Sequence, residues 1–223
     1  EWTTEKRVIG VSFDGTGYGT DGTIWGGEIL LADYDSFTRW GCIEPFAQTG
    51  GDASAKEGWR IAVSLLGKIY GKENALLIIE TLGLCESKLA KLQFTMEERG
   101  INTVQSTSAG RLFDAVSAIL DIRKSSTFEG EASTSLQFAA EKWLDAQKKK
   151  IAGSEDFAES GIIADYGELK SISDVAQKSV VEKNNSINRN IKADLYYLPT
   201  LSLVKELAER KLAGENSNQL ALH

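Results

Sequence analysis

Residues 12–28 have the sequence SFDGTGYGTDGTIWGGE, and the prediction of the fold starts from this stretch. Six of its seventeen residues are glycine, and short apolar runs at 8–11 and 29–31 lead into it and out of it. Such runs, bounded by Gly and Asp clusters, are typical of two strands joined by a turn. Glycines let the backbone lie close to another group, and successive backbone N–H groups can form a concave anion site. The stretch therefore predicts a β-hairpin that holds a phosphate, with Asp14 at its start placed to bind a metal, orient a water or accept a proton.

The alternative is a tight hairpin in which the glycines serve turn geometry alone, although an ordinary two-residue turn needs only one or two glycines. No Gly-Lys-Ser/Thr follows, as a P-loop would require, and no helix follows directly, as a dinucleotide fingerprint would require. A phosphate held by a β-hairpin is a feature of the actin-like ATPase fold. The pattern thus predicts an α/β fold with an antiparallel or mixed sheet and packed helices.

Composition excludes several classes of function. The chain has 223 residues, with 25 basic and 32 acidic side chains and a net charge of −7, which disfavours nucleic acid or an anionic membrane as the main partner. No apolar run approaches the length of a membrane span, and the N-terminus carries neither a signal peptide nor a Met. The missing Met leads us to expect a fragment of a longer protein. Two separated cysteines and one histidine, His223, supply neither a zinc site nor a Ser–His or Cys–His nucleophile pair.

Hydrophobic periodicity predicts the order of elements. Residues 7–45 should form a three-stranded antiparallel meander, and helices from residue 53 onward should pack against one of its faces. The stretch 46–52 is expected to be a loop in which Asp52 caps the next helix. Helices are expected at 53–70, 72–83, 87–99, 128–150 and 199–212, with a last one starting at 216, and glycines stand at several of their ends. The weak pattern from 151 to 193 predicts irregular structure.

A second informative stretch is 103–122, TVQSTSAGRLFDAVSAILDI, in which Ser and Thr residues lead into a helical apolar pattern. Gly110, Arg111 and Asp114 fall in the first turns of this helix, where backbone amides and a guanidinium attract anions. The alternative is a capped helix with an i,i+3 ion pair. If the functional interpretation holds, the start of this helix should lie beside the glycine-rich loop, across one shared pocket.

Together these motifs resemble a known family. DGTGYGTDGTIWGGE, GGDASAKEGWRIA, SAGRLFDAVSAILDI and FEGEA are similar to the Kae1-like domain of the HypF carbamoyltransferases of [NiFe]-hydrogenase maturation. The resemblance runs from about residue 7 to 141, is loose from 151, and recovers at 214–223. It implies an actin-like ATPase (ASKHA, Kae1-like) half-domain, with residues 1–150 as the core fragment and 151–223 as an irregular to helical continuation.

The resemblance also implies a function. Proteins of this family are cytoplasmic, and YrdC-like and other modules precede the Kae1-like domain. They move the carbamoyl group of carbamoyl adenylate, made from ATP and carbamoyl phosphate, to the C-terminal cysteine of HypE, and the product becomes a cyanide ligand of the hydrogenase iron. The acceptor thiolate comes from the partner, so no internal nucleophile is required.

Residue roles follow from the same resemblance. Gly15, Thr16 and Gly17 would hold the phosphate of carbamoyl adenylate through backbone amides, and Asp14 would be the catalytic and metal-binding residue. The nucleotide site would be completed by Gly26, Gly27, Gly110, Arg111, Asp114 and Glu131, with Asp114 facing the ribose hydroxyls. The other ligands of a divalent Fe or Zn ion are expected in a histidine-rich motif before residue 1 and an Asp after residue 223. The fragment alone should therefore be inactive and poor in metal.

Two other functions stay open from the sequence. One is a related enzyme of the actin-like fold, such as a small-molecule O-carbamoyltransferase or a relative of sugar kinases. The other is a non-catalytic module in which the glycine hairpin is structural and the helical part docks a partner.

Overall fold

The computed structural model describes residues 7–152 and 195–222. Contacts group residues 1–144 and 195–223 into one compact unit and residues 145–194 into another. The predicted irregular segment at 151–193 lies almost entirely outside the described residues, and the division of the chain at residue 150 stays a prediction. The following description concerns the first unit.

The glycine-rich stretch forms the expected hairpin. Strands β1 (Val8–Tyr18) and β2 (Ile24–Ala32) pair antiparallel, and β3 (Phe37–Ile43) pairs antiparallel with β2, which confirms the predicted meander. Local side chains close both turns. In the first turn Asp21 Oδ1 accepts the Thr23 N–H (3.1 Å), and in the second Asp33 Oδ1 accepts the Ser36 N–H (2.8 Å).

Three further strands, each of three or four residues, make the sheet mixed. Strand β4 (Phe46–Thr49) pairs antiparallel with β5 (Thr103–Ser106), β5 meets β2 in parallel, and β6 (Tyr196–Leu198) pairs in parallel with β3. The order is β4-β5-β2-β3-β6, with β1 also paired to β2. The prediction of a loop over 46–52 is wrong, because four of these residues pair with a strand more than fifty positions later.

Helices account for most of the rest. They are α1 (Asp52–Lys56), α2 (Gly58–Tyr70), α3 (Lys72–Thr81), α4 (Ser87–Glu98), α5 (Ala109–Ile119), α6 (Glu131–Ala152), α8 (Thr200–Leu212) and α9 (Ser217–Leu220). The glycines predicted to end helices do so at Gly71, Gly83, Gly100 and Gly214, all with positive φ, which an L side chain rarely adopts. Among the described residues, no helix has both the length and the apolar character needed to cross a lipid bilayer.

Two predicted helix features are wrong. The single helix over 53–70 is two helices that break at Glu57, where the N–H of Trp59 bonds instead to the carbonyl of Lys124 (3.2 Å). Asp52 does not cap α1, because Gly51 occupies the N-cap position and no side chain bonds there. The break joins the end of α1 to the segment that follows α5, because the carbonyl oxygen of Lys56 accepts the N–H of Ser126 (2.6 Å).

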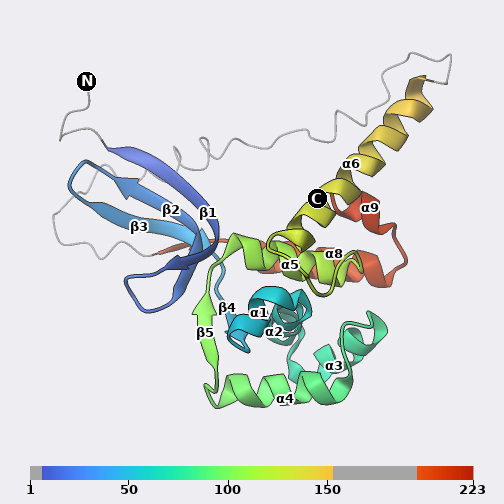
Figure 1. Cartoon of the computed structure of the whole chain (residues 1–223), viewed down its shortest axis with the longest axis horizontal. Coiled ribbons are helices and arrows are strands. Elements are labelled where there is room, and N and C mark those ends of the chain that lie inside the picture. The colour runs from blue at the N-terminus through green and yellow to red at the C-terminus, as the bar shows by residue number, and fades with distance from the viewer. Residues whose placement is uncertain (1–6, 153–194, 223) are drawn as a thin grey trace. The chain divides into compact units, whose positions relative to one another are not determined.

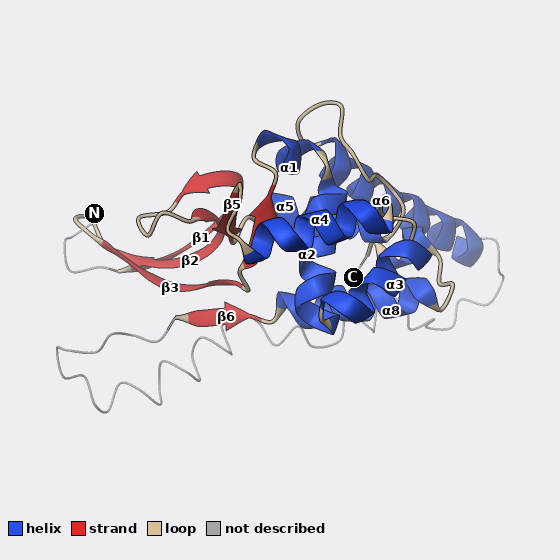
Figure 2. Cartoon of the chain, turned by 90° about the horizontal axis from the view of Figure 1, so that it is seen from below, coloured by secondary structure: helices blue, strands red, loops and turns tan. Residues whose placement is uncertain are grey.

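Helix α2 lies at the centre of the core. Its Ile61, Ala62, Leu65 and Leu66 are buried among residues of α3, α5 and α8. In both views the helices lie toward the β4–β5 end of the sheet, and the far ends of β1–β3 extend away from them (Figure 1, Figure 2). The expectation that helices would cover one face of the meander therefore holds only near this end. Along β1, the side chains of the alternate residues Ile9, Val11 and Phe13 are left uncovered, and these residues are more than half exposed.

Candidate functional site

Strand β1 leaves the regular ladder at residues 14–16. Its register with β2 shifts between Phe13 and Gly17, so Asp14, Gly15 and Thr16 form a bulge. The hydroxyl of Ser108 bonds the carbonyl oxygens of Asp14 (3.0 Å) and Gly15 (2.8 Å). Ser108 is also the N-cap of α5, where its Oγ accepts the N–H of Arg111 (3.1 Å). One side chain thus joins the glycine-rich bulge to the start of α5.

The two motifs meet at backbone distance, and only glycine allows this. A Cβ added to Gly110 would lie 2.8 Å from the Cα of Gly15, and one added to Gly26 would lie 2.6 Å from the carbonyl oxygen of Asp14. These separations are shorter than real Cβ contacts allow. The structure thereby confirms that the helix carrying Gly110, Arg111 and Asp114 begins beside the 15–17 loop.

This contact leads to a prediction for Gly110→Ala. In the first turn of a helix, propensity alone would make Ala more stable than Gly by about 1 kcal/mol. The clash with Gly15 should reverse the sign, so that the variant loses about 1–3 kcal/mol of unfolding free energy, as overpacked sites do. Urea unfolding measures the difference. Gly10→Ala is the control, because its Cβ would meet only ordinary contacts at 3.9 Å. A stabilised Gly110→Ala variant would mean that the two segments are not in contact.

Arg111 is buried yet directed toward the bulge. Its Nη1 donates to the carbonyl oxygen of Ala55 and lies 3.1 Å from Asp114 Oδ2, and its guanidinium Nε is buried without a partner. Its Nη2 lies 3.6 Å from the position of a Cβ on Gly15. No hydrogen bond engages Nη2 in the part of the chain that the structure describes. A planar guanidinium held on one edge and free on the other is suited to bind an oxyanion.

Asp114 lies beneath Arg111 and does not line the pocket. The residue is about 4% exposed, and burial raises the pKa of its carboxyl to about 6, although Arg111 opposes the shift. Its predicted contact with ribose hydroxyls stays a prediction. In this structure Asp114 holds the guanidinium in place.

The raised pKa predicts a pH dependence of stability. Since the folded state holds this proton more tightly than the unfolded chain, the Asp114 contribution to unfolding free energy falls as pH rises from about 4 to about 6 and is constant above. The change amounts to about 3 kcal/mol at most. Other carboxylates, such as Asp21 and Asp33, have lowered pKa values and change stability in the opposite direction. The measurement is therefore the difference between wild type and Asp114→Asn in urea unfolding from pH 4 to 8. A difference that does not vary with pH would contradict the shift.

A pocket of about 320 Å³ opens at the bulge. It is lined by Asp14, Gly15, Thr16, Ala55, Lys56, Arg111, Thr127, Phe128 and Glu129. A second hollow of about 450 Å³ shares Thr16 and Ala55 with it and presents neutral polar side chains such as Gln48, Ser54 and Asn102. Asp14 is exposed, and its Oδ1 accepts the N–H of Gly15 (2.6 Å). Four of the predicted residues, Asp14, Gly15, Thr16 and Arg111, therefore line one pocket.

The other predicted residues lie around this pocket without lining it. Gly17 pairs with Trp25 in the hairpin, Gly26 is buried between Asp14 and Ser108, and Gly27 is buried against Thr107 and Ile43. Glu131 is buried, accepts from the N–H (2.6 Å) and hydroxyl (3.0 Å) of Thr127, and pairs with Arg123 (3.1 Å). The bond from the Thr127 N–H is the main reason that the pKa of Glu131 lies below its usual range. Glu131 thus holds the 127–129 wall of the pocket.

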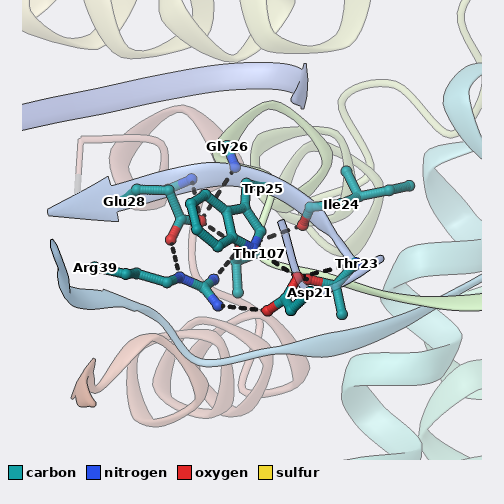
Figure 3. A network of polar contacts seen from close by, with 9 residues as sticks. Asp21, Thr23, Ile24, Trp25, Gly26, Glu28, Arg39 and Thr107 are labelled. Atoms are coloured by element: carbon teal, nitrogen blue, oxygen red, sulfur yellow. Dashed lines mark hydrogen bonds and ion pairs between the residues drawn. The ribbon is translucent and has the colours of Figure 1, made fainter. Parts of the chain in front are cut away.

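A buried polar network supports the hairpin, and sequence reasoning missed it (Figure 3). Glu28 accepts from Arg39 Nε (2.5 Å), from the Thr107 hydroxyl, and from the N–H of Gly26 (3.2 Å). Arg39 also reaches Asp21 at the hairpin tip (3.1 Å) and Thr107 (3.1 Å). Thr107 precedes the N-cap Ser108, so the network links the hairpin tip to the start of α5. The sequence signal was Glu28 itself, a carboxylate between Gly27 and an apolar strand.

The described residues do not by themselves fit a transition-metal site. No group of three or more His, Cys, Asp or Glu side chains lies close enough to hold a metal ion in 7–152 or 195–222. Asp14 remains the one predicted ligand at the pocket, whereas transition metals usually take three or four protein ligands.

Comparison with known proteins gives consistent matches. A family profile described as "Carbamoyltransferase, Kae1-like Domain, second subdomain" matches residues 10–222. The probable carbamoyltransferase HypF of Methanocaldococcus jannaschii is 40% identical over 136 residues, covering 61% of this chain and 18% of the relative. A carbamoyltransferase HypF homolog of Cupriavidus necator is 34% identical over 152 residues, covering 66% of this chain and 36% of the relative. The chain thus spans about a fifth to a third of the length of these curated relatives.

Solved structures agree in fold. The crystal structure of a full-length HypF in the phosphate- and nucleotide-bound form has a TM-score of 0.67 and 25% identity, covering 97% of this chain and 23% of the other. The HypF of T. kodakarensis has a TM-score of 0.62 and 23% identity, covering 96% and 24%, and shows the shared fold.

Proposed function

Because the chain belongs to the HypF carbamoyltransferase family, within the second subdomain of its Kae1-like domain, we propose that it forms one wall of a carbamoyl-transfer site. The donor is carbamoyl adenylate derived from ATP. The acceptor is the C-terminal cysteine of a HypE-like protein, and the product becomes a cyanide ligand of [NiFe]-hydrogenase. YrdC-like and other modules of the complete cytoplasmic protein supply the adenylate.

One observation carries this proposal: the free Nη2 edge of Arg111 lies beside the bulge at Gly15 in a pocket of about 320 Å³. A phosphate in this pocket would meet the guanidinium and the backbone of the bulge. A similar HypF has been crystallised with phosphate and nucleotide, which supports the same ligand class here.

The chemistry is a substitution at the carbamoyl carbon. The acceptor thiolate attacks this carbon and forms a C–S bond, the C–O bond to the phosphate breaks, and the electron pair stays on the phosphate oxygen of the departing AMP. Arg111 and the bulge hold the phosphate so that the carbamoyl carbon is presented to the acceptor.

Neither cysteine of this chain is suited to act as the nucleophile, which agrees with a thiolate supplied by the acceptor protein. Cys42 is about 1% exposed, and burial raises the pKa of its thiol to about 11. Burial also raises the pKa of Cys85. Both thiols are therefore poor nucleophiles near neutral pH. Because the described residues do not form a metal site, no step is assigned to the divalent Fe or Zn ion expected in the complete protein.

The test is a transfer assay with the complete protein, ATP, radiolabelled carbamoyl phosphate and a HypE-like acceptor. We expect label on the acceptor, and none on an acceptor whose C-terminal cysteine is replaced by Ala. Label on a small hydroxyl compound in the absence of the acceptor would instead favour an O-carbamoyltransferase. No transfer by an intact protein that makes carbamoyl adenylate would contradict the proposal.

A further inference from the structure

The pocket contains a second cation, Lys56, which lies within the motif GGDASAKEGWRIA and to which the proposed function assigns no role. We propose that Lys56 neutralises the negative charge that develops on the phosphate as AMP leaves, while Arg111 binds the phosphate throughout. This inference rests on the proposed function and assigns a further catalytic residue to it.

The backbone at Lys56 is held on both sides. The carbonyl oxygen of the preceding residue, Ala55, accepts from Arg111 Nη1, and the carbonyl oxygen of Lys56 itself accepts the N–H of Ser126 (2.6 Å). The end of α1 is thus fixed to α5 on one side and to the wall of the pocket on the other. Such anchoring gives the Lys56 side chain a defined origin next to Arg111.

The ammonium group itself is left free. Among the described residues, no hydrogen bond or ion pair engages the Lys56 side chain, which is exposed at the pocket. The adjacent acid, Glu57, is occupied by Arg60 (2.5 Å). The acids that line the pocket are Asp14 and Glu129, and Asp14 Oδ1 is already bonded to the N–H of Gly15 (2.6 Å). An unpaired lysine beside a fixed arginine has the character of a ligand for an anion.

Arg111 and Lys56 differ in burial and in the number of their partners, and we assign them different roles for this reason. Arg111 is about 8% exposed, is fixed by Ala55 and Asp114, and can hold a phosphate from the start of the reaction. Lys56 carries a compact charge on a flexible stem at the surface of the pocket. In carbamoyl adenylate the phosphate carries one negative charge, and it gains a second as the C–O bond breaks, becoming a phosphate monoester. A cation that meets this second charge stabilises the transition state and the product more than the ground state, so it acts mainly on kcat.

The experiment compares Lys56→Met and Lys56→Arg with wild type in the complete protein. Lys91→Met is the control, because Lys91 is an exposed lysine on α4 that lines neither pocket. We expect Lys56→Met to lower kcat about 10²-fold, the usual effect of losing one charge-stabilising donor. Its KM for carbamoyl adenylate should change less than about threefold, and inhibition by AMP should weaken about tenfold. Lys56→Arg should restore most of kcat, and Lys91→Met should match wild type.

Three results would overturn the inference. An unchanged kcat together with an unchanged KM in Lys56→Met would make Lys56 a solvated surface lysine. A rise in KM at unchanged kcat would mean that it binds ground state and transition state equally. Failure of Lys56→Arg to restore activity would exclude a role for charge. AMP binding also separates this inference from the proposed function. Wild-type protein that binds no AMP would contradict both. If wild type binds AMP, Arg111→Met does not, and Lys56→Met binds AMP as tightly as wild type, the phosphate site stands and the role of Lys56 is wrong.

Discussion

Asp14→Asn in the complete protein will reduce carbamoyl transfer at least about 10²-fold and leave the fold intact, an effect of the size seen for groups that act in proton transfer or charge stabilisation. Asn has the shape of Asp and keeps a carbonyl oxygen for the N–H of Gly15, the contact that Asp14 makes in the bulge. What the substitution removes is the negative charge at the pocket. The backbone should therefore remain in place while the chemistry that needs a carboxylate is lost.

The measurement is the initial rate of carbamoyl transfer to the acceptor cysteine, with circular dichroism and urea unfolding as checks on the fold. Asp35→Asn is the matched control, since Asp35 is an exposed acid in the β2–β3 turn and lines neither pocket. Transfer at the wild-type rate by the Asp14→Asn variant would remove Asp14 from the catalytic site. A rate loss shared by Asp35→Asn would mean that net charge, and not position, is responsible.

Arg111→Met has the second large expected effect, on both stability and binding. It leaves the buried carboxylate of Asp114 without its partner, and breaking a buried pair typically costs about 3–5 kcal/mol. The variant should also lose AMP binding, because the guanidinium edge beside Gly15 is gone. Without Arg111, which lowers the pKa of Asp114, that pKa rises above about 6. At pH 5 the buried Asp114 carboxyl of the variant is protonated and uncharged in the folded state, whereas at pH 8 the solvated carboxyl of the unfolded chain ionises much more favourably than the buried one. The loss of unfolding free energy should therefore be smaller at pH 5 than at pH 8.

A double variant separates the two effects. Arg111→Met with Asp114→Asn removes the uncompensated charge, so it should recover much of the unfolding free energy and lose the part of the pH dependence that Asp114 contributes. It should not recover AMP binding, which calorimetric titration measures. Recovery of binding in the double variant would show that Arg111 stabilises the helix start without contacting the phosphate, which is the capped-helix interpretation.

Local patterns in the sequence determined much of the fold. The glycine and Asp clusters with their flanking apolar runs predicted the β1–β2–β3 meander, because turn chemistry and apolar alternation act over a few residues. Helical periodicity and terminal glycines predicted α3, α4 and α8 for the same reason. Glycines in both motifs also allowed the correct expectation that the 15–17 loop lies beside α5. Residue chemistry alone marked Asp14 and Arg111, which the structure places in one pocket.

Tertiary structure alone decided the remaining features. Strand β4 forms only because β5 lies alongside it, and the break between α1 and α2 at Glu57 goes with a bond from Trp59 to Lys124. Both depend on partners far along the chain, and no local pattern encodes such partners. The same applies to the Glu28–Arg39 pair, which the fold buries, and to Lys56, which the fold places in the same pocket as Arg111. The sequence marked Asp14, Gly15, Thr16 and Arg111 as candidates for a phosphate site, and long-range packing decided that these four share a pocket and that Lys56 joins them.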